Sequence, residues 1–275
     1  MLETVRNAFK LKEIRIKDIR KKLFYTFCMM VVIRMGSQLP VPGVNGSYFS
    51  EWFSGNSGSA FGFFDAITGG SFEKMSVFAL NITPYITSSI IIQLLTIAIP
   101  KLEELQKDGE EGRKKMTAIT RYLTVALALM ESLAMAIGFG RSGLLIKFNA
   151  LNVITAVVTL TAGSTVIMWI GERITENGVG NGISIVLTIN IISRIPQDLT
   201  LLFEQFVKGK EIAFQVLNLA IIIAIIIIVT VLTVALQGAE RRIPVQYSRK
   251  VQGRKQVGGQ TSHIPLKVNT AGVIP

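Results

Sequence analysis

Six apolar runs, each of a length that can cross a bilayer, constrain the fold of this chain more than any other feature. A helix rises about 1.5 Å per residue, so about 20 apolar residues cross a hydrocarbon core of about 30 Å. Backbone groups in lipid must be paired within the protein, so the runs predict helices and an all-α, polytopic membrane bundle. The runs cover about 23–39, 76–99, 117–138, 151–170, 183–203 and 213–236.

Composition supports the membrane class and narrows the chemistry. Hydrophobic residues make up 49% of the chain and charged residues only 17%, whereas about 25% of a typical soluble domain is charged. The single cysteine, Cys28, lies inside the first apolar run, and the single histidine, His263, lies in a polar loop. No disulfide can form within the chain, and we expect no zinc or haem site, no metal and no cofactor.

The distribution of Lys and Arg predicts the orientation in the membrane. With the N-terminus inside, 22 of the 29 basic residues lie on the inner side, as the positive-inside rule requires. They comprise 8 in 1–22, 6 in 100–121, 1 in 171–182 and 7 in 238–270. The net charge of +11 therefore belongs mostly to the cytoplasmic face. Anionic lipid, RNA and acidic protein surfaces are all candidate partners of that face.

A short apolar stub over 60–70 precedes the second run. It carries three phenylalanines, is too short to span and is followed by charged residues. Non-spanning structure at membrane depth is tolerated only when it is buried in protein or lines a cavity. Pro84, close to Asn81 and Thr83, would free a backbone carbonyl inside the second run. These features favour a helix that lines an aqueous path, and ordinary packing of small polar residues is the alternative.

Three further features lie in or beside the later runs. The fourth run is rich in Thr, Ser, Gly and Ala, which is typical of close helix packing rather than a substrate path. The glycine-rich segment 171–184 lacks the Gly-Lys-Ser/Thr of a phosphate site and predicts a tight turn, with Asn181 as a helix cap. Glu131, inside the third run, is either a proton-relay residue or a protonated or cavity-facing structural one. A relay would need an ionisable partner at the same depth, and the sequence offers none.

The loop 238–270 is basic, polar and longer than a minimal connection. Apolar and basic residues alternate along it, which predicts a structured hairpin that projects into the cytoplasm. A docking platform is the favoured interpretation, and a solvated loop that only obeys the topology rule is the alternative. The last residues, 271–275, read as the start of another apolar run, so we expect the chain to be a fragment.

Several long motifs, in order along the whole chain, resemble the SecY family, whose members are channel subunits of the bacterial protein translocase. The stretch "RMGSQLPVPG" (34–43) resembles the motif after the first helix of the family. The stretch "GFFDAITGGSFEKMSVFALNITPYITSSIIIQLL" (62–95) is similar to its plug and second helix. The stretches "GERITENGVGNGISI" (171–185), "ERRIPVQYSRK" (240–250) and "SHIPLKVNTAGVIP" (262–275) are similar to the fourth-to-fifth junction and the large cytoplasmic loop.

The resemblance implies roles for the stub and for the two helices that follow the motifs. The stub becomes a plug that closes the channel from the external side, and the second helix becomes a pore wall and one side of a lateral gate. The implied plug residues are Phe61, Phe63, Phe64, Asp65 and Ile67. The implied ring at the constriction comprises Ile82, Ile86, Leu187 and Ile191. The implied gate residues are Thr87, Ile90 and Gln93.

Each pair of ring residues is spaced i, i+4, so each pair lies on one helix face. An apolar ring of this kind would resist ion leak by dewetting. Two positions depart from the family pattern. Leu187 stands where isoleucine is usual, and Glu131 stands where an uncharged polar residue is expected, which leaves the role of Glu131 open.

The resemblance also implies partners. The basic loop would dock the ribosome or the SecA motor through phosphate or carboxylate contacts. The residues that match are Arg241, Arg242, Arg249, Lys250, Arg254 and Lys255. SecE and SecG would be membrane partners, and signal sequences and unfolded polypeptides would be the substrates. The chain would lie in the bacterial inner membrane, in contact with the lipid bilayer, with its N-terminus in the cytoplasm. No ATP site is apparent, so the driving force would come from a partner.

The implied organisation divides the chain into five parts. They are an amphipathic cytoplasmic N-terminus over 1–22, a five-span half over 23–207 with the plug at 60–70, a sixth span over 208–237, a docking loop over 238–270 and the start of a seventh span over 271–275. The expected function is conduction of unfolded polypeptide, without enzymatic activity. A secondary transporter with broken helices is the rival, but it predicts paired charges or ion ligands near the midplane. An intramembrane enzyme would need a histidine dyad or a metal cluster at that depth.

Overall fold

The computed structural model describes residues 2–46, 48, 51–52, 60–208, 212–245, 250–252, 255–257 and 262–269. Side chains are described for 18–46, 48, 51–52, 62–141, 143–208, 214–245 and 263–269. The chain forms two compact units, 1–196 and 197–274.

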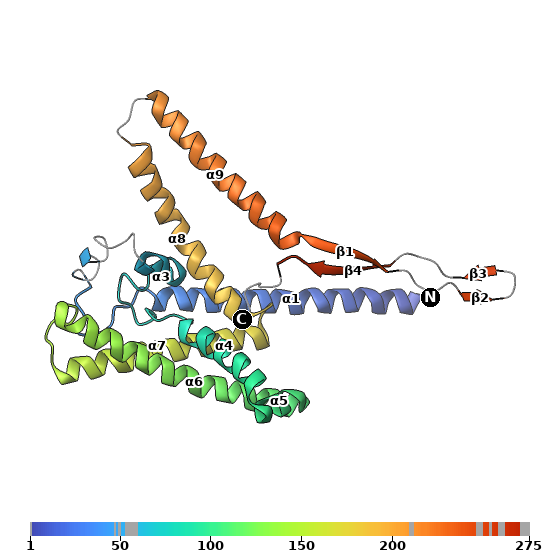
Figure 1. The fold of residues 1–275 in the computed structure, drawn as a ribbon, viewed down its shortest axis with the longest axis horizontal. Coiled ribbons are helices and arrows are strands. Elements are labelled where there is room, and N and C mark those ends of the chain that lie inside the picture. The colour runs from blue at the N-terminus through green and yellow to red at the C-terminus, as the bar shows by residue number, and fades with distance from the viewer. Residues whose placement is uncertain are drawn as a thin grey trace. The chain divides into compact units, whose positions relative to one another are not determined.

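Helices make up most of the described chain (Figure 1). They are α1 (Leu2–Gly36), α3 (Ala60–Thr68), α4 (Thr83–Ala98), α5 (Pro100–Lys107), α6 (Gly109–Gly138), the short 3-10 turn η1 (Gly140–Ser142), α7 (Ala150–Asn177), α8 (Gly182–Phe206) and α9 (Ile212–Gly238). Four short strands follow: β1 (Glu240–Val245), β2 (Lys250–Gln252), β3 (Lys255–Val257) and β4 (Ser262–Lys267).

Four helices of the described chain are long and apolar enough to cross a membrane. They are α6, α7, α8 and α9, and they contain the third, fourth, fifth and sixth predicted spans. The first predicted span, 23–39, falls mostly within α1, but the helix ends at Gly36 and the last three residues lie outside it. The multi-pass helical class is therefore confirmed, while the first span stays a prediction.

The second predicted span, 76–99, is only partly a helix. Helix α4 begins at Thr83, with Pro84 in its first turn. The missing N–H of a proline is harmless there, because the first helical N–H groups have no partner in the helix. Pro84 therefore does not interrupt a helix, because the turn that precedes it is not helical. The helix ends at Ala98, and α5 leaves at an angle of 104° to it.

The segment 69–82 is not helical, and tertiary contacts satisfy its backbone. The N–H of Val77 donates to the carbonyl of Leu39 (2.8 Å), and the N–H of Val41 donates to the carbonyl of Met75 (3.0 Å). Ile82, the last residue before α4, is fully buried. Irregular backbone of this kind is stable at membrane depth only when protein covers it.

Helix α7 is the centre of the first unit. Its small residues receive the irregular segment: a Cβ at Gly163 would lie 1.9 Å from the carbonyl oxygen of Val77. The hydroxyl of Ser164 donates to the carbonyl of Asn81 (3.1 Å). The prediction that the small residues of the fourth run serve close packing is confirmed. Asn181, before α8, accepts a hydrogen bond from the N–H of Ile183 (3.0 Å), as the predicted cap requires.

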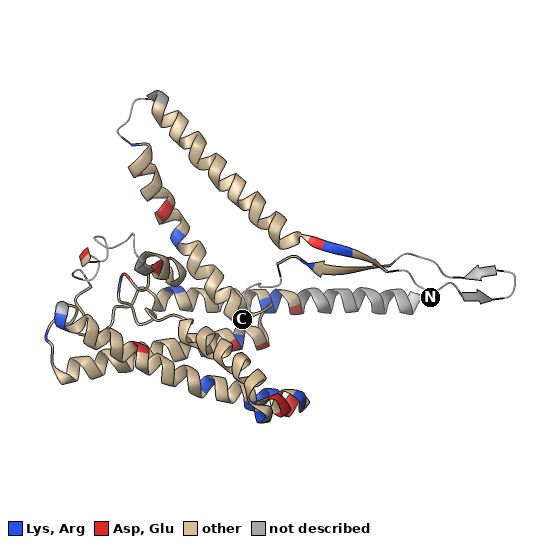
Figure 2. Cartoon of the chain, viewed as in Figure 1, with Lys and Arg blue, Asp and Glu red and all other residues tan. Residues whose placement is uncertain are grey.

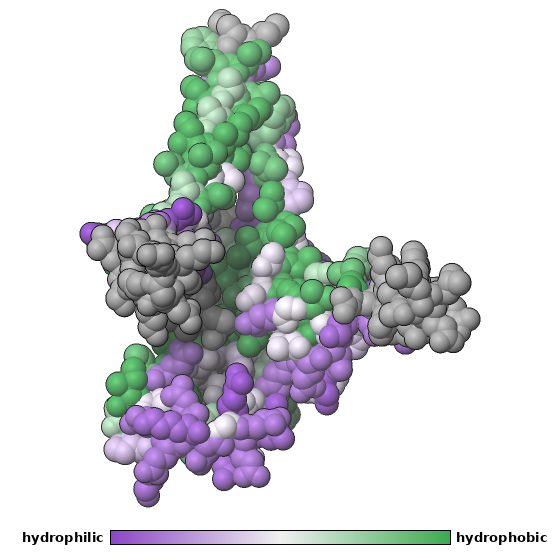
Figure 3. Space-filling model, turned by 90° about the vertical axis from the view of Figure 1, so that its right-hand side faces the viewer, coloured by the Kyte–Doolittle hydropathy of each residue, from purple (hydrophilic) through white to green (hydrophobic). Residues whose placement is uncertain are grey.

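Helix α9, in the second unit, differs in both composition and surroundings. It contains no Asp, Glu, Lys or Arg (Figure 2). None of its most apolar 18-residue window is buried. The space-filling view shows an almost continuous hydrophobic surface along it (Figure 3). Such a helix suits lipid or another apolar partner.

The strands after α9 form two antiparallel ribbons. β1 pairs with β4, with Glu240 opposite Lys267 and Val245 opposite Ser262. β2 pairs with β3 in the same sense. The predicted hairpin in the loop 238–270 is confirmed for these residues.

Candidate functional site

The stub predicted at 60–70 is the nine-residue helix α3, which ends at Thr68. Gly69 and Gly70 follow with φ of +70° and +79°, a backbone conformation that other residues rarely adopt. A Cβ at Gly69 would lie 2.5 Å from the carbonyl oxygen of Asn190. Glycine therefore permits the end of α3 to rest directly on the backbone of α8.

Asp65 is the most constrained residue of α3, because its side chain has no solvent exposure. One carboxylate oxygen, Oδ1, accepts a hydrogen bond from the N–H of Glu73 (2.8 Å). The other, Oδ2, forms an ion pair with Nη1 of Arg194 on α8, whose side chain is 14% exposed. The hydroxyl of Thr68 donates to the carbonyl of Asp65 (3.1 Å).

The apolar side chains of α3 lie in different surroundings. The ring of Phe64 packs edge-on against Phe72, with 5.0 Å between centroids. Phe63 is 72% exposed. The side chain of Phe61 lies outside the described residues. The carbonyl of Ile67 accepts a long hydrogen bond from Nδ2 of Asn81 (3.4 Å).

A chain of polar side chains connects three elements around α3. Nη1 of Arg34, on α1, donates to Oδ1 of Asn190 (3.5 Å). Nδ2 of Asn190 donates to Oδ1 of Asn81 (3.0 Å), and both asparagines are buried. Asn81 has a φ of +52°, which asparagine tolerates better than most residues.

The sequence analysis did not identify these contacts of Arg34 and Arg194. One signal was available in the sequence. Asn190 and Arg194 are spaced i, i+4, so they share a face of one apolar helix, where polar groups need partners.

Three of the four predicted ring residues pack against one cluster. Ile82 belongs to its buried core, and Ile86 and Leu187 are partly buried against it. The fourth, Ile191, is 46% exposed. The other buried members of the cluster come from α1, the segment before α4, α7 and α8: Ile33, Phe78, Ile167, Ile170, Ile174 and Val186. Convergence of all four residues on one axis stays a prediction.

The three predicted gate residues form one exposed stripe of α4. Thr87, Ile90 and Gln93 are exposed, and the hydroxyl of Thr87 bonds to the carbonyl of Thr83 (3.1 Å). The opposite stripe of α4 packs inward through Ser88, Ile92 and Thr96. Helix α4 therefore has one face that packs against the rest of the described chain and one face that is exposed in it.

Glu131, on α6, lines a cavity of about 510 Å³ beside α3. The other lining residues are Phe64, Phe72, Leu80, Thr83, Ala134, Met135 and Phe139. None of these seven is ionisable, so the described cavity offers no proton-relay partner. The cavity-facing alternative for Glu131 agrees with this placement.

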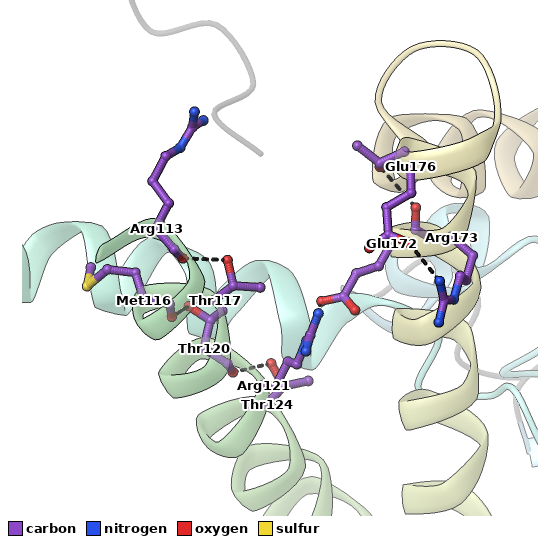
Figure 4. A network of polar contacts seen from close by, with 11 residues as sticks. Arg113, Met116, Thr117, Thr120, Arg121, Thr124, Glu172, Arg173 and Glu176 are labelled. Carbon is purple, nitrogen blue, oxygen red and sulfur yellow. Dashed lines mark hydrogen bonds and ion pairs between the residues drawn. The ribbon is translucent and has the colours of Figure 1, made fainter. Parts of the chain in front are cut away.

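A second polar cluster joins α6 to α7 (Figure 4). Nε of Arg121 on α6 lies 2.8 Å from Oε1 of Glu172 on α7. Arg173 pairs with Glu176 (2.8 Å), and its guanidinium lies 5.6 Å from the ring centroid of Trp169. The arginines are already neutralised by acids, so this cluster serves as a tether rather than as a basic binding patch.

The predicted docking residues are only partly described. Arg241 and Arg242 are exposed, adjacent residues of β1, so they point to opposite faces of the ribbon. The backbones of Lys250 and Lys255 lie in β2 and β3. Arg249, Arg254 and the side chains of both lysines lie outside the described residues.

The described residues hold no group of three or more His, Cys, Asp or Glu that could bind a metal.

Sequence comparison places the chain beside one family. The profile described as SecY matches residues 76–275. The protein translocase subunit SecY of Pseudomonas aeruginosa is 40% identical over 260 residues, which cover 94% of this chain and 58% of that protein. The SecY subunits of Streptomyces scabiei and Escherichia coli strain K12 are 42% and 39% identical, and the matches cover 64% and 58% of those proteins. The chain thus spans about six-tenths of the relatives it matches.

Solved structures share the fold at lower identity. A protein-conducting channel matches with a TM-score of 0.56 and 20% identity, over 90% of this chain and 53% of the other. Sec61 in the canine ribosome–channel complex from the endoplasmic reticulum matches with a TM-score of 0.54 and 19% identity, over 82% and 50%. A structure concerned with the plug domain of SecY matches with a TM-score of 0.55 and 19% identity, over 93% and 54%.

Proposed function

Because the chain belongs to the SecY family, we propose that it is the N-terminal part of the pore-forming subunit of a protein-conducting channel. The channel passes unfolded secretory polypeptides across a membrane and releases membrane segments sideways through a gate. One observation carries the proposal: a helix too short to span, α3, is held beside a predicted span whose first residues, 76–82, are not helical. That arrangement needs a protein-lined cavity rather than lipid.

The parts of the channel are assigned as follows. Helix α3 is the plug that closes the external side. Ile82, Ile86, Leu187 and Ile191 contribute part of an apolar ring, with the remaining members supplied by the part of the relatives that this chain does not cover. The exposed stripe of α4 with Thr87, Ile90 and Gln93 faces that same part and forms one side of the lateral gate.

The partners follow from the surfaces. SecE and SecG bind the membrane-facing helices, and the strongly apolar α9 suits either a lipid or a helical partner. The basic ribbon of β1 to β4 binds the ribosome or SecA through charge. We place the subunit in the bacterial inner membrane with its N-terminus in the cytoplasm, because the basic loops then obey the positive-inside rule. The channel itself performs no enzymatic reaction.

The rival function, a secondary transporter, has less support. It would place paired charges or ion ligands at the midplane. The polar groups of the first unit instead hold α3 and the segment 69–82 against α8. Glu131 has no ionisable neighbour in its cavity.

The ring assignment provides the decisive test. In the full-length channel, reconstituted in vesicles, Ile86→Asn should wet the constriction, raise ion conductance and relax the need for a strong signal sequence. Ile225→Asn on α9, where isoleucine is 54% exposed, is the matched control. It should hinder insertion by about 1 kcal/mol without opening a path. Equal conductance of both variants and the unmodified channel, with translocation absent, would contradict the proposal.

A further inference from the structure

We propose that Asp65 and Arg194, together with the pair Asn81 and Asn190, form an electrostatic latch that holds the plug helix α3 closed against α8. The inference rests on the proposed channel function and names the residues that regulate it. The latch consists of one buried ion pair and one buried amide pair. Both pairs have one member on α8 and the other member on α3 or on the irregular segment that follows it.

The ion pair carries most of the latch. Asp65 has no solvent exposure and Arg194 is 14% exposed, so water screens their attraction weakly. The Glu73 N–H on Oδ1 holds the Asp65 carboxylate in place, and Oδ2 is left to face Arg194. A buried charge that loses its partner is strongly unfavourable. If α3 moves away, Asp65 leaves with it and Arg194 stays on α8, so displacement of the plug separates the two charges.

The amide pair sets the position of the ion pair. Asn190 lies one helical turn before Arg194 and donates to Asn81, while its backbone carbonyl lies where any side chain at Gly69 would clash. The turn before that carries Val186, which is fully buried. Val186, Asn190 and Arg194 thus form one inward stripe of α8. Leu187 and Ile191 of the proposed ring come one residue later in the sequence, on the neighbouring stripe.

This arrangement couples the plug to the state of the ring. A polypeptide that widens the ring displaces Leu187 and Ile191, and the same movement of α8 carries Asn190 and Arg194 away from α3. Water that enters the widened funnel raises the local dielectric and weakens the remaining ion pair. The latch is therefore strong while the funnel is dry and weak once a substrate has opened it.

The test uses the full-length channel complex in vesicles, with Cys28→Ala and a reporter cysteine, Ser71→Cys, at a position only 2% exposed. An impermeant maleimide added outside reports plug displacement, and ion flux reports leak. Asp65→Asn and Arg194→Gln should each raise both rates at least about tenfold, since each removes one charge of a buried ion pair. The double variant should label and leak less than either single variant, because it removes both charges of the pair and leaves neither facing the space of the other.

Glu204→Gln is the matched control, since Glu204 pairs with Lys208 at an exposed site. It should change neither rate. Two single variants on opposite partners keep the test available if one of them fails to assemble. Rates equal to those of the unmodified channel in either single variant overturn the latch, and so does a raised leak without raised labelling. A complex that labels as expected but translocates nothing keeps the latch and refutes the channel function instead.

Discussion

Helices α7 and α9 have nearly the same length and both are apolar, yet they differ in how much of their surface is buried. In α7, 44% of the most apolar window is buried, and in α9 none of it is. Helix α7 is dense in Gly, Ala, Ser and Thr, whereas α9 is dominated by isoleucine, valine and leucine. Small side chains admit a neighbouring backbone, and large aliphatic ones suit lipid.

The difference explains how an interrupted span can exist in a membrane protein. The segment 69–82 leaves backbone groups without helical partners, and α7 supplies both the space and one of the hydrogen bonds that they need. Helix α9 could not do this, because its bulky surface would keep another backbone away. A broken span therefore requires a specific neighbour, while an unbroken one requires only lipid.

The largest expected effect comes from filling the space at Gly163. In the full-length protein, Gly163→Val should lower the free energy of unfolding by about 3 kcal/mol or more, because its Cβ would lie 1.9 Å from the carbonyl oxygen of Val77. Ala224→Val, at an exposed position of α9, should have little effect. Unfolding in mixed detergent micelles measures both. A tolerated Gly163→Val would mean that the segment 69–82 does not rest on α7.

A smaller effect should follow from removing the hydroxyl of Ser164. This hydroxyl donates to the carbonyl of Asn81, which is far away in the sequence and buried. Ser164→Ala should cost about 1–2 kcal/mol, because a buried carbonyl loses a partner. Thr230→Ala on α9 removes a hydroxyl that bonds only within its own helix, at an exposed position, and should cost far less. The same unfolding assay compares them, and equal losses would remove the distinction between the two helices.

The smallest effect concerns the tether between α6 and α7. Arg121→Gln breaks the ion pair with Glu172. The side chain of Arg121 is 48% exposed and that of Glu172 is 16% exposed. The loss should be about 0.5–1 kcal/mol and should shrink as salt is added. Lys208→Gln breaks the exposed ion pair with Glu204, four residues earlier in the sequence. The side chain of Lys208 is 69% exposed and that of Glu204 is 52% exposed. Its effect should be close to zero at every salt concentration. A larger loss for Lys208→Gln would show that exposure does not rank these pairs.

The sequence by itself was sufficient for several features of the fold. Apolar runs of bilayer length predicted α6 to α9, and an apolar stub too short to span predicted a non-spanning segment where α3 lies. Family motifs predicted the likeness to channel structures, which the comparisons bear out. These features depend on local composition and periodicity, which can be read from neighbouring residues of the sequence without knowledge of the fold.

The candidate site was less accessible from the sequence. The family resemblance implied that Asp65 is a plug residue, but the sequence did not identify Arg194 as its partner. Nothing in a single sequence connects two residues so far apart. Ile191 matched a ring motif like its three companions, yet it is exposed where Ile82 is fully buried. Burial depends on which segments meet, and the motif does not record that.

The start of α4 shows most clearly which features the sequence determines and which features depend on the tertiary structure. The sequence determined that 76–99 is apolar and predicted that it lies in the membrane, because transfer from water to lipid depends on composition. Only the tertiary structure decided that the helix begins at Thr83. Residues 76–82 can give up helical hydrogen bonds because Leu39, Gly163 and Ser164 provide other partners or room for their backbone. In a medium without water, backbone groups must find partners somewhere, and the choice between local and distant partners is made by the neighbours that folding brings together.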